Sequence, residues 1–389
     1  MECDVIVVGA GPAGLAFARG LNGSGLRTIL IERQPREAIA EPAEDGRAIA
    51  LTHRSVDILD RLGAWSQIIP AAVHPLRRAA VLDGRSAVAL SVDPVAGREG
   101  RLGQLVANHD IRRALFDATR NQPGLELMTD VRIADIRRDN RHAMVVLKDG
   151  RAVRSKLLVG ADSRFSEVRQ KLRIGADVER LGKAMLVVEV AHRRDHHGVA
   201  LEWFGYGQTI ALLPLSPRHS SVVLTLTEDA ATRLARGDPV TLARELTARS
   251  SGRLGAMQTV SRPHIYPLAT VWSHHFATRR AALIGDAAVG MHPVTAHGFN
   301  LGLRGATMLA KRVSHAAAVG QDIAAPLLLR RYEAAHRLIA GPVFAATAFV
   351  VQLYTDERPA ARLVRPALLH AAARLRPVRA ALSHALMHH

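Results

Sequence analysis

The chain has 389 residues, of which 48% are hydrophobic, and its 52 Lys and Arg residues outnumber its 35 Asp and Glu residues to give a formal net charge of +17. This composition excludes a disordered or fibrous protein, and at roughly 150 residues per domain the length predicts two or three structural units. Cys3 is the only cysteine, which excludes an intrachain disulfide and any zinc or iron–sulfur site built on cysteines.

The first elements predicted along the chain are a strand, a helix and a second strand. Residues Asp4–Val8 and Thr28–Ile31 are apolar runs, and Pro12–Leu21 between them is rich in Ala and Leu. A strand without polar alternation is typical of a parallel sheet that is covered on both faces. No basic region precedes the first strand, so we expect no cleaved signal peptide.

A glycine motif, GAGPAG, joins the first strand to the helix. Gly9 permits a tight turn, Gly11 lets a pyrophosphate approach the backbone, and Gly14 lets the helix pack closely on the strand. Glu32 ends the second strand, where its carboxylate can accept hydrogen bonds from ribose hydroxyls. The combination predicts a dinucleotide site, and it does not separate NAD from FAD.

The middle of the chain is rich in predicted strands. Ala143–Leu147 and Ala152–Val159 flank an Asp-Gly turn and are expected to form a hairpin that leads to Asp162. Residues 184–227 hold several β-rich runs separated by turn residues, and these predict a largely antiparallel second lobe inserted into the first.

A third element follows near residue 281. Ala281–Ile284 is predicted to be a buried strand that leads to Asp286, and a helix is expected from about Asn300. Asp162 and Asp286 thus each follow a strand, at the edge where ligands of open α/β sheets bind. The Gly-Phe-Asn-Leu-Gly segment at the start of the helix would direct free N–H groups at an electron-rich ring.

These three elements, in this order, resemble those of the FAD-dependent aromatic hydroxylases typified by para-hydroxybenzoate hydroxylase. Residues Asp45–Leu51, Ser55–Trp65 and His292-Pro293 are most similar to the ubiquinone-biosynthesis hydroxylases within that group. The resemblance runs from Cys3 to about Arg365 and implies FAD as the cofactor.

We therefore predict an α/β fold in which a Rossmann-like FAD-binding domain carries an inserted, mainly antiparallel β-sheet substrate domain and C-terminal helices. The predicted boundaries are 1–75, 100–178 and 265–325 for the FAD-binding domain, 76–99 and 179–264 for the substrate domain, and 326–389 for the C-terminal helical region with a basic amphipathic tail.

The resemblance also implies roles for individual residues and no metal site. The implied FAD contacts are Gly9, Gly11, Pro12, Ala13, Gly14, Glu32 and Arg33 around the ADP half, Arg47 and Gln104 near the ribityl and pyrophosphate groups, Val131 at the adenine, Asp162 in an element that also serves the nicotinamide cofactor, Asp286 at the ribityl chain, and Gly298, Phe299 and Asn300 at the N1/O2 edge of the flavin. His292 and Pro293 are the implied catalytic residues, beside flavin and substrate.

The chain departs from the family pattern at several positions. Ser163 stands where the family usually has Gly, and Gly305 stands where an Asp is common. Val289 replaces a common His, and Ala296-His297-Gly298 replaces a Gly-Gln-Gly segment.

The function that the resemblance implies is monooxygenation of the aromatic ring of a polyprenylated phenol in ubiquinone biosynthesis. Reduced flavin would react with O2 to a C4a-hydroperoxide that transfers one oxygen atom, with NAD(P)H or another donor supplying electrons. Two alternatives stay open: a non-catalytic flavin- or lipid-binding subunit of a quinone-biosynthesis complex, and a flavin-dependent dehydrogenase or reductase on the same scaffold. The ring position, the prenyl length, the electron donor and the oligomeric state are not determined by the sequence.

Two groups of histidines invite a chemical interpretation. His292 and His297 flank the expected flavin face, where either would orient a phenol or relay its proton at a near-neutral pKa, or else be held by backbone hydrogen bonds. His192, His196 and His197 have a spacing seen in metal sites but no third ligand nearby, so we expect a solvated, charged loop there.

The C-terminal part is apolar and then basic. The uncharged run Ala340–Tyr354 is shorter than the ~20 residues of a spanning helix, so no transmembrane segment is expected. In the helix predicted around Leu375–Leu386, one apolar face opposes the arginines and would either lie on an anionic membrane or pack on the protein itself. We expect a cytoplasmic protein, peripheral on the inner face of the membrane, with other quinone-biosynthesis proteins as partners and no nucleic acid.

Overall fold

Buried aliphatic strands form the centre of the first sheet in the computed structural model, which describes residues 1–84, 90–94, 100–205, 207–293 and 297–355. Val5, Ile6 and Val7 have no exposed surface, and burial of such side chains stabilises the fold by about 1.5–3 kcal/mol each. The strands of this sheet, in spatial order, are β19 (Ala277–Thr278), β20 (Ala281–Leu283), β12 (Leu157–Gly160), β1 (Val5–Val8), β2 (Thr28–Ile31) and β8 (Leu125–Met128). All neighbours are parallel except β19 and β20, which confirms the predicted parallel sheet.

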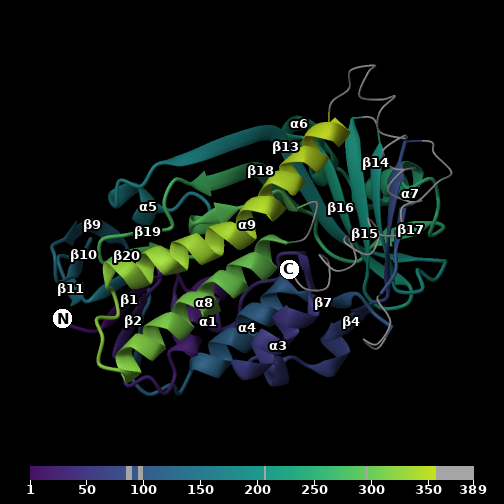
Figure 1. Ribbon diagram of the computed structural model, residues 1–389. Coiled ribbons are helices and arrows are strands. Elements are labelled where there is room, and N and C mark those ends of the chain that lie inside the picture. Colours follow the sequence, from purple (N-terminus) through teal and green to yellow (C-terminus); the bar gives the residue numbers. More distant parts are fainter. Residues whose placement is uncertain (85–89, 95–99, 206, 294–296, 356–389) are drawn as a thin grey trace.

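Three helices pack along this sheet: α1 (Pro12–Gly20), α4 (Asn108–Thr119) and α8 (Gly298–Ala318). Figure 1 shows α8 and α4 beside α1, close to the first sheet. The helix predicted from about Asn300 therefore exists and begins at Gly298. Shorter helical segments in the same part of the chain are α2 (Arg36–Ala40), α3 (His53–Arg61), α5 (Glu167–Lys171), η1 (Trp65–Gln67), η2 (Pro70–Ala72) and η3 (Gly285–Ala287).

The predicted hairpin forms, but its second strand is shorter than expected. The prediction treated Ala152–Val159 as one strand, whereas the chain leaves the hairpin after Ser155 and begins a new strand at Leu157. The first part pairs with the hairpin and the second with β1, so no single straight strand satisfies both sheets. The hairpin sheet consists of β9 (Ile133–Arg138), β10 (Ala143–Leu147) and β11 (Ala152–Ser155).

The β-rich middle of the chain forms a nine-stranded, mainly antiparallel sheet, as predicted. Its strands, in spatial order, are β21 (Val289–Gly290), β18 (His264–Ser273), β13 (Ala176–His192), β16 (His219–Thr227), β15 (Gln208–Pro214), β14 (Val199–Gly205), β5 (Arg78–Asp83) and β6 (Leu90–Val92), with β17 (Met257–Thr259) beside β13. Helices α6 (Glu228–Arg236) and α7 (Pro239–Arg249) cover one face and enclose a second core.

A small sheet connects the two larger ones. It consists of β3 (Ala48–Leu51), β7 (Gly103–Ala107) and β4 (Val73–Leu76), all antiparallel. The segment that enters β3 touches the nine-stranded sheet, where Tyr266 Oη donates a hydrogen bond of 2.6 Å to the Asp45 carbonyl. The small sheet and the nine-stranded sheet therefore meet at residues 45–47.

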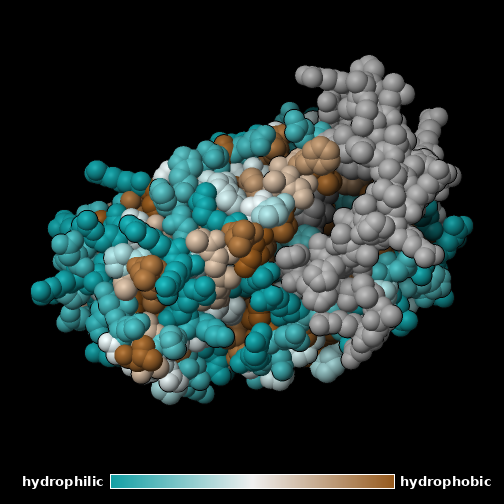
Figure 2. Space-filling model, in the orientation of Figure 1, coloured by the Kyte–Doolittle hydropathy of each residue, from teal (hydrophilic) through white to brown (hydrophobic). Residues whose placement is uncertain are grey.

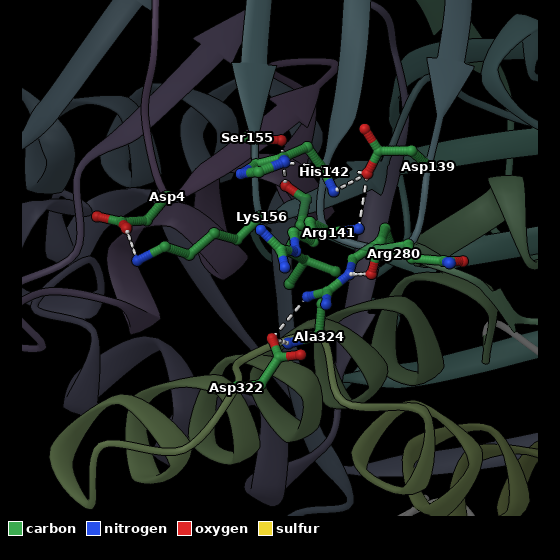
Figure 3. A network of polar contacts seen from close by, with 11 residues as sticks. Asp4, Asp139, Arg141, His142, Ser155, Lys156, Arg280, Asp322 and Ala324 are labelled. Atoms are coloured by element: carbon green, nitrogen blue, oxygen red, sulfur yellow. Dashed lines mark hydrogen bonds and ion pairs between the residues drawn. The ribbon is translucent and has the colours of Figure 1, made fainter.

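Polar side chains hold together the amino-terminal edge of the parallel sheet (Figure 3). Lys156, just before β12, forms a 2.8 Å ion pair with Asp4, just before β1. Arg280, just before β20, pairs at 2.6 Å with Asp322, which also accepts the Ala324 N–H. These polar groups thus tie strand starts together, and the opposite edge is left for ligands.

The last described helix, α9 (Pro326–Thr355), lies across α8 and β19 (Figure 1). Pro326–Gln352 has the length and apolar composition of a membrane span, with 17% of its most apolar window buried in the protein. Tyr332 is fully buried and donates a hydrogen bond to the Leu283 carbonyl, which anchors the helix to the parallel sheet. The amphipathic helix predicted around Leu375–Leu386 falls outside the described residues.

A histidine of α9 fills the space beside the unusual glycine of α8. A Cβ atom on Gly305 would lie 2.7 Å from His336 Nε2, so no larger residue fits there while His336 keeps its place. The His336 ring stacks on Tyr332 and is 1% exposed. Burial lowers the pKa of this imidazole to about 4. The departure from the family pattern at residue 305 is therefore matched by a buried, neutral histidine.

His336 should make the protein less stable in mild acid. The imidazole protonates near pH 6.5 in the unfolded chain but only near pH 4 in the folded one, so the free energy of unfolding should fall as pH drops through this window, by up to about 1.4 kcal/mol per pH unit. His336→Leu should flatten this slope in denaturant titrations at pH 7, 6 and 5.

The exposed His315 of α8 offers the matched control, since His315→Gln should leave the slope unchanged. A wild-type slope that persists in His336→Leu would show that this histidine does not carry the effect.

Candidate active site

The turn after β1 leaves an open space at the start of α1. Gly9 has φ +104°, and a Cβ there would lie 2.5 Å from the Ala161 carbonyl oxygen. A Cβ on Gly14 would lie 1.9 Å from the Gly9 carbonyl oxygen, so the helix can approach the turn only with glycine at both positions. A Cβ on Gly11 would meet nothing within 4 Å. The N–H groups of the first helical turn therefore border an accessible space suited to a phosphate.

Glu32 lies at the same edge, at the end of β2. Its Oε2 accepts the Ala10 N–H at 2.7 Å and its Oε1 accepts the Gln34 N–H at 3.0 Å. These bonds hold the carboxylate beside the glycine turn, and its remaining lone pairs can accept ribose hydroxyls. Val131 donates its N–H to the Glu32 carbonyl, which places it next to this site, whereas the Arg33 side chain is exposed.

Asp162 follows β12, but its carboxylate points into the protein. It accepts hydrogen bonds from the Ser166 hydroxyl (2.6 Å) and the Val168 N–H (2.9 Å), and burial raises its pKa. Arg169 is also buried and donates to the Arg164 and Ala287 carbonyls. Asp162 and Arg169 thus stabilise the turn that follows β12. Ser163 in that turn has φ +80°, a conformation that favours glycine, which explains the family's usual residue there.

Arg164, which the sequence analysis did not assign, joins this turn to the third element. Its Nη2 donates to Asp286 Oδ2 at 3.0 Å and to the Met291 carbonyl at 3.3 Å, and its Nη1 donates to the Ala269 carbonyl at 2.6 Å. Arg164 therefore orients Asp286, whose side chain is 37% exposed. The sequence shows an arginine two residues after Asp162. It does not show that this arginine would pair with Asp286, which lies far away in the chain.

The Asp286 turn packs tightly between α1 and α8. A Cβ on Gly285 would lie 2.8 Å from the Ala13 side chain, and a Cβ on Gly302 would lie 3.3 Å from the Gly285 Cα. The glycine turn of β1, the Asp286 turn and the start of α8 therefore converge.

Asn300 attaches the start of α8 to β3. Its Oδ1 accepts the Thr52 N–H at 3.2 Å, and its Nδ2 donates to the Ala50 carbonyl at 2.9 Å. Phe299 packs partly buried against the main core. The amide side chain is thus used to hold the helix in place, while the N–H groups of Gly298 and Phe299 open the helix with no intrahelical partner.

Arg47 lies just before β3, where the small sheet meets the nine-stranded sheet. It forms a 2.6 Å ion pair with Asp45, and its guanidinium stacks over the Tyr266 ring at 5.2 Å. The hydrogen bond and charge of Arg47, and to a smaller extent a hydrogen bond from Asn108, lower the pKa of the Asp45 carboxyl despite its burial. A cavity of about 370 Å³ opens beside Arg47, and Gln104 is buried on the adjacent β7.

His292 and Pro293 are partly buried on the loop that follows Gly290. Burial lowers the pKa of His292 to about 4, and the positive charges of Arg164 and Lys183 add to the effect. The near-neutral pKa expected for this histidine is therefore wrong, because the side chain is both desolvated and surrounded by cations. His292 can offer a neutral imidazole for hydrogen bonding. His297 is buried at the start of α8.

The second group of histidines holds a loop together. His192 is buried, and its ring nitrogens lie 2.7 Å from the Arg194 carbonyl and 2.9 Å from the Ser220 hydroxyl. His196 Nε2 lies 2.6 Å from the Ser216 carbonyl. Only His197 is solvated, so the expected solvated loop is wrong for the other two. Within the described ranges, no group of three or more His, Cys, Asp or Glu side chains is placed to hold a metal ion.

The residues around the glycine turn suit a dinucleotide that carries a ring. The space over Gly11 admits a phosphate, Glu32 is oriented for a ribose, Asp286 is exposed for a polyol, and the start of α8 supplies N–H groups. The contacts of Gly285 with Ala13 and Gly302 bring the glycine turn, the Asp286 turn and the start of α8 together. A ribose, a phosphate, a polyol and a ring are the parts of FAD, so these groups suit that cofactor.

Comparisons with known proteins agree with this geometry. The family described as "FAD binding domain" matches residues 2–347. The chain is 42% identical to the ubiquinone hydroxylase UbiM of Neisseria meningitidis, over 97% of this chain and 83% of that protein. It is 33% identical to the ubiquinone hydroxylase UbiL of Rhodospirillum rubrum, over 97% and 87%. The solved anhydrotetracycline hydroxylase OxyS of Streptomyces rimosus has the same fold, with a TM-score of 0.75, 23% identity, and coverage of 100% of this chain and 76% of that one.

Substitutions in the glycine turn should separate cofactor binding from folding. Gly11→Val should abolish FAD binding yet leave a folded protein, because its Cβ enters only the open space. Gly14→Ala should lower the thermal midpoint of the apoprotein, because its Cβ would meet the Gly9 carbonyl oxygen. Flavin content after gel filtration and the apoprotein melting temperature measure the two effects. Tight FAD binding by Gly11→Val would contradict the cradle described above.

Proposed function

This chain belongs to the FAD-binding-domain family, and from that premise we propose that it is an FAD-dependent monooxygenase that hydroxylates a phenol in ubiquinone biosynthesis. The observation that carries the proposal is the similarity to two ubiquinone hydroxylases over 97% of the chain. The same similarity favours a hydroxylase over a non-catalytic subunit or a flavin-dependent dehydrogenase.

The residues of the site divide the binding of FAD among themselves. Gly11, Pro12 and Ala13 would border the pyrophosphate, Glu32 would accept the ribose hydroxyls, and Asp286 would accept the ribityl hydroxyls. Arg47 would lie beside the ribityl chain, and Gly298 would direct its N–H at the ring edge. Bound FAD, reduced by NAD(P)H or another donor, supplies the activation of O2.

The protein's own contribution is to orient the phenol and to keep water away from it. His292 is neutral at physiological pH, so it can accept or donate a hydrogen bond to a phenol without placing a charge beside the ring. Pro293 would border the ring on the same loop. The burial that lowers the pKa of His292 would also limit the access of water to this part of the site, which would suppress side reactions of the reduced cofactor.

We further propose that the phenol carries a polyprenyl chain and that the protein binds peripherally to the inner, anionic face of the membrane. Other quinone-biosynthesis proteins would be its partners there. Leu338 and Phe349 of α9 are 78% and 59% exposed. Figure 2 shows hydrophobic residues along the course of α9. The buried Tyr332 and His336 keep one side of this helix on the protein, so its exposed side would lie on the lipid surface rather than cross the membrane.

The oxygenase activity is tested with 2-farnesylphenol, a reductant and ¹⁸O₂. One ¹⁸O atom should enter each product molecule, and His292→Ala should retain FAD but convert a smaller share of the reducing equivalents into product. An unlabelled product would indicate a dehydrogenase, and FAD-loaded protein that forms no product with any electron donor would indicate a non-catalytic subunit.

The membrane proposal is tested by sedimentation with vesicles that contain phosphatidylglycerol. Replacing Leu338 and Phe349 by Gln should weaken binding about fivefold per position, since each loses about 1 kcal/mol of apolar burial. The matched control replaces the exposed Val240 and Val260, which lie outside α9, by Gln. Equal binding by both double variants would rule out α9 as the contact surface.

A further inference from the structure

The carboxyl group of Glu202 lies beside apolar residues on the face of the nine-stranded sheet that α6 and α7 leave uncovered, a face that it shares with Asp83 of β5 and Glu189 of β13. Glu202 of β14 pairs with Ala211 of β15 and with Val81 of β5. Residues that pair directly across a sheet project from the same face, so these three side chains share one side. Leu201 and Trp203, which alternate with Glu202, pack instead into the core under the two helices.

This face is the one turned toward the expected flavin. The row that contains Glu202 continues through Ala211 to Val223 and then to Val187. A Cβ on Gly46 would lie 3.5 Å from the Val187 side chain, so the row reaches the segment that carries Arg47. Glu202 therefore lies on the same side of the sheet as the segment that carries Arg47.

Within the part of the chain that the structure describes, Glu202 has no hydrogen-bond or ion-pair partner. Burial raises the pKa of its carboxyl to about 8, and no hydrogen bond or charged group contributes to the shift. Neighbours on the same face are Val81, Ala211 and, two residues along β14, the buried Phe204, whose partner on β5 is the buried Asp83. A carboxyl group without a partner in apolar surroundings destabilises the fold unless a ligand satisfies it.

We propose that Glu202 binds the hydroxyl group of the phenol substrate and thereby determines which ring carbon faces the flavin. The inference rests on the proposed function, because it takes the phenol as the ligand. A carboxyl oxygen accepts the phenol O–H in either protonation state, and the protonated acid can also donate to the phenol oxygen. The apolar residues of the row would contact the ring itself.

In this arrangement the apolar residues bind the ring, and Glu202 determines its orientation. An apolar surface alone cannot distinguish the two ends of a substituted ring, whereas one polar anchor in such a surface orients it. Glu202 is then a specificity residue for the position of hydroxylation, in addition to a binding residue.

The test compares 2-farnesylphenol with its O-methyl ether on FAD-loaded protein, with binding followed by the change in flavin absorbance. Glu202→Leu should weaken binding of the phenol about tenfold or more and change the affinity for the ether less than twofold, because only the phenol can donate the lost hydrogen bond. Glu202→Gln should retain most of the phenol affinity, and Glu202→Leu should give a mixture of hydroxylation positions.

The exposed Glu179 of β13 supplies the control, and Glu179→Leu should bind both compounds as the wild type does. An equal loss of both ligands in Glu202→Leu, or no loss of either, would overturn this inference alone. Wild-type protein that retains FAD but neither binds nor hydroxylates the phenol would overturn the proposed function and this inference with it.

Discussion

The close packing of Gly14 on the Gly9 carbonyl is the constraint on which the rest of the site depends. A side chain at either position would move α1 away from the parallel sheet. With α1 in place, Ala13 packs on the Gly285 turn, and Gly302 brings α8 onto that same turn. The phosphate-binding turn, the Asp286 carboxylate and the N-terminus of α8 are therefore positioned relative to one another by contacts that only small residues permit.

Two side chains extend this arrangement from one sheet to the other. Arg164 connects Asp286 to β18 of the nine-stranded sheet, and Asn300 connects α8 to β3, which enters from the junction at Arg47. Arg164 donates hydrogen bonds to a carboxylate and to backbone carbonyls, whereas Asn300 accepts one from a backbone N–H and donates one to a carbonyl. Each side chain therefore holds more than one segment in a single geometry. These hydrogen bonds therefore fix the relative positions of the residues that would line a site between the sheets.

The titratable groups near the site differ in how deeply they are buried and in which charged groups lie beside them. Asp286 keeps a partly exposed side chain in an ion pair with Arg164, whereas burial and the neighbouring cations both lower the pKa of His292. Burial alone raises the pKa of the Glu202 carboxyl to about 8. A neutral imidazole and a largely neutral carboxyl suit an uncharged aromatic ring, because covering a charged group with the ring would cost that group its hydration.

The sequence by itself determined what depends on neighbours along the chain. The apolar runs Val5–Val8 and Thr28–Ile31 are strands, and the glycine motif, Glu32 and Asp286 lie at one sheet edge, because the βαβ unit and its turn are local structures. The nine-stranded sheet was also predictable, from β-rich runs between turns.

Only the tertiary structure decided which distant groups meet. The partner of Arg164, the split of the hairpin strand after Ser155, the lowered pKa of His292 and the match of His336 with Gly305 all join residues far apart in the chain or depend on burial, so no local pattern contains them. The face that Glu202 occupies follows from strand pairing across five strands, and a shift of one residue in any of them would turn it to the other side.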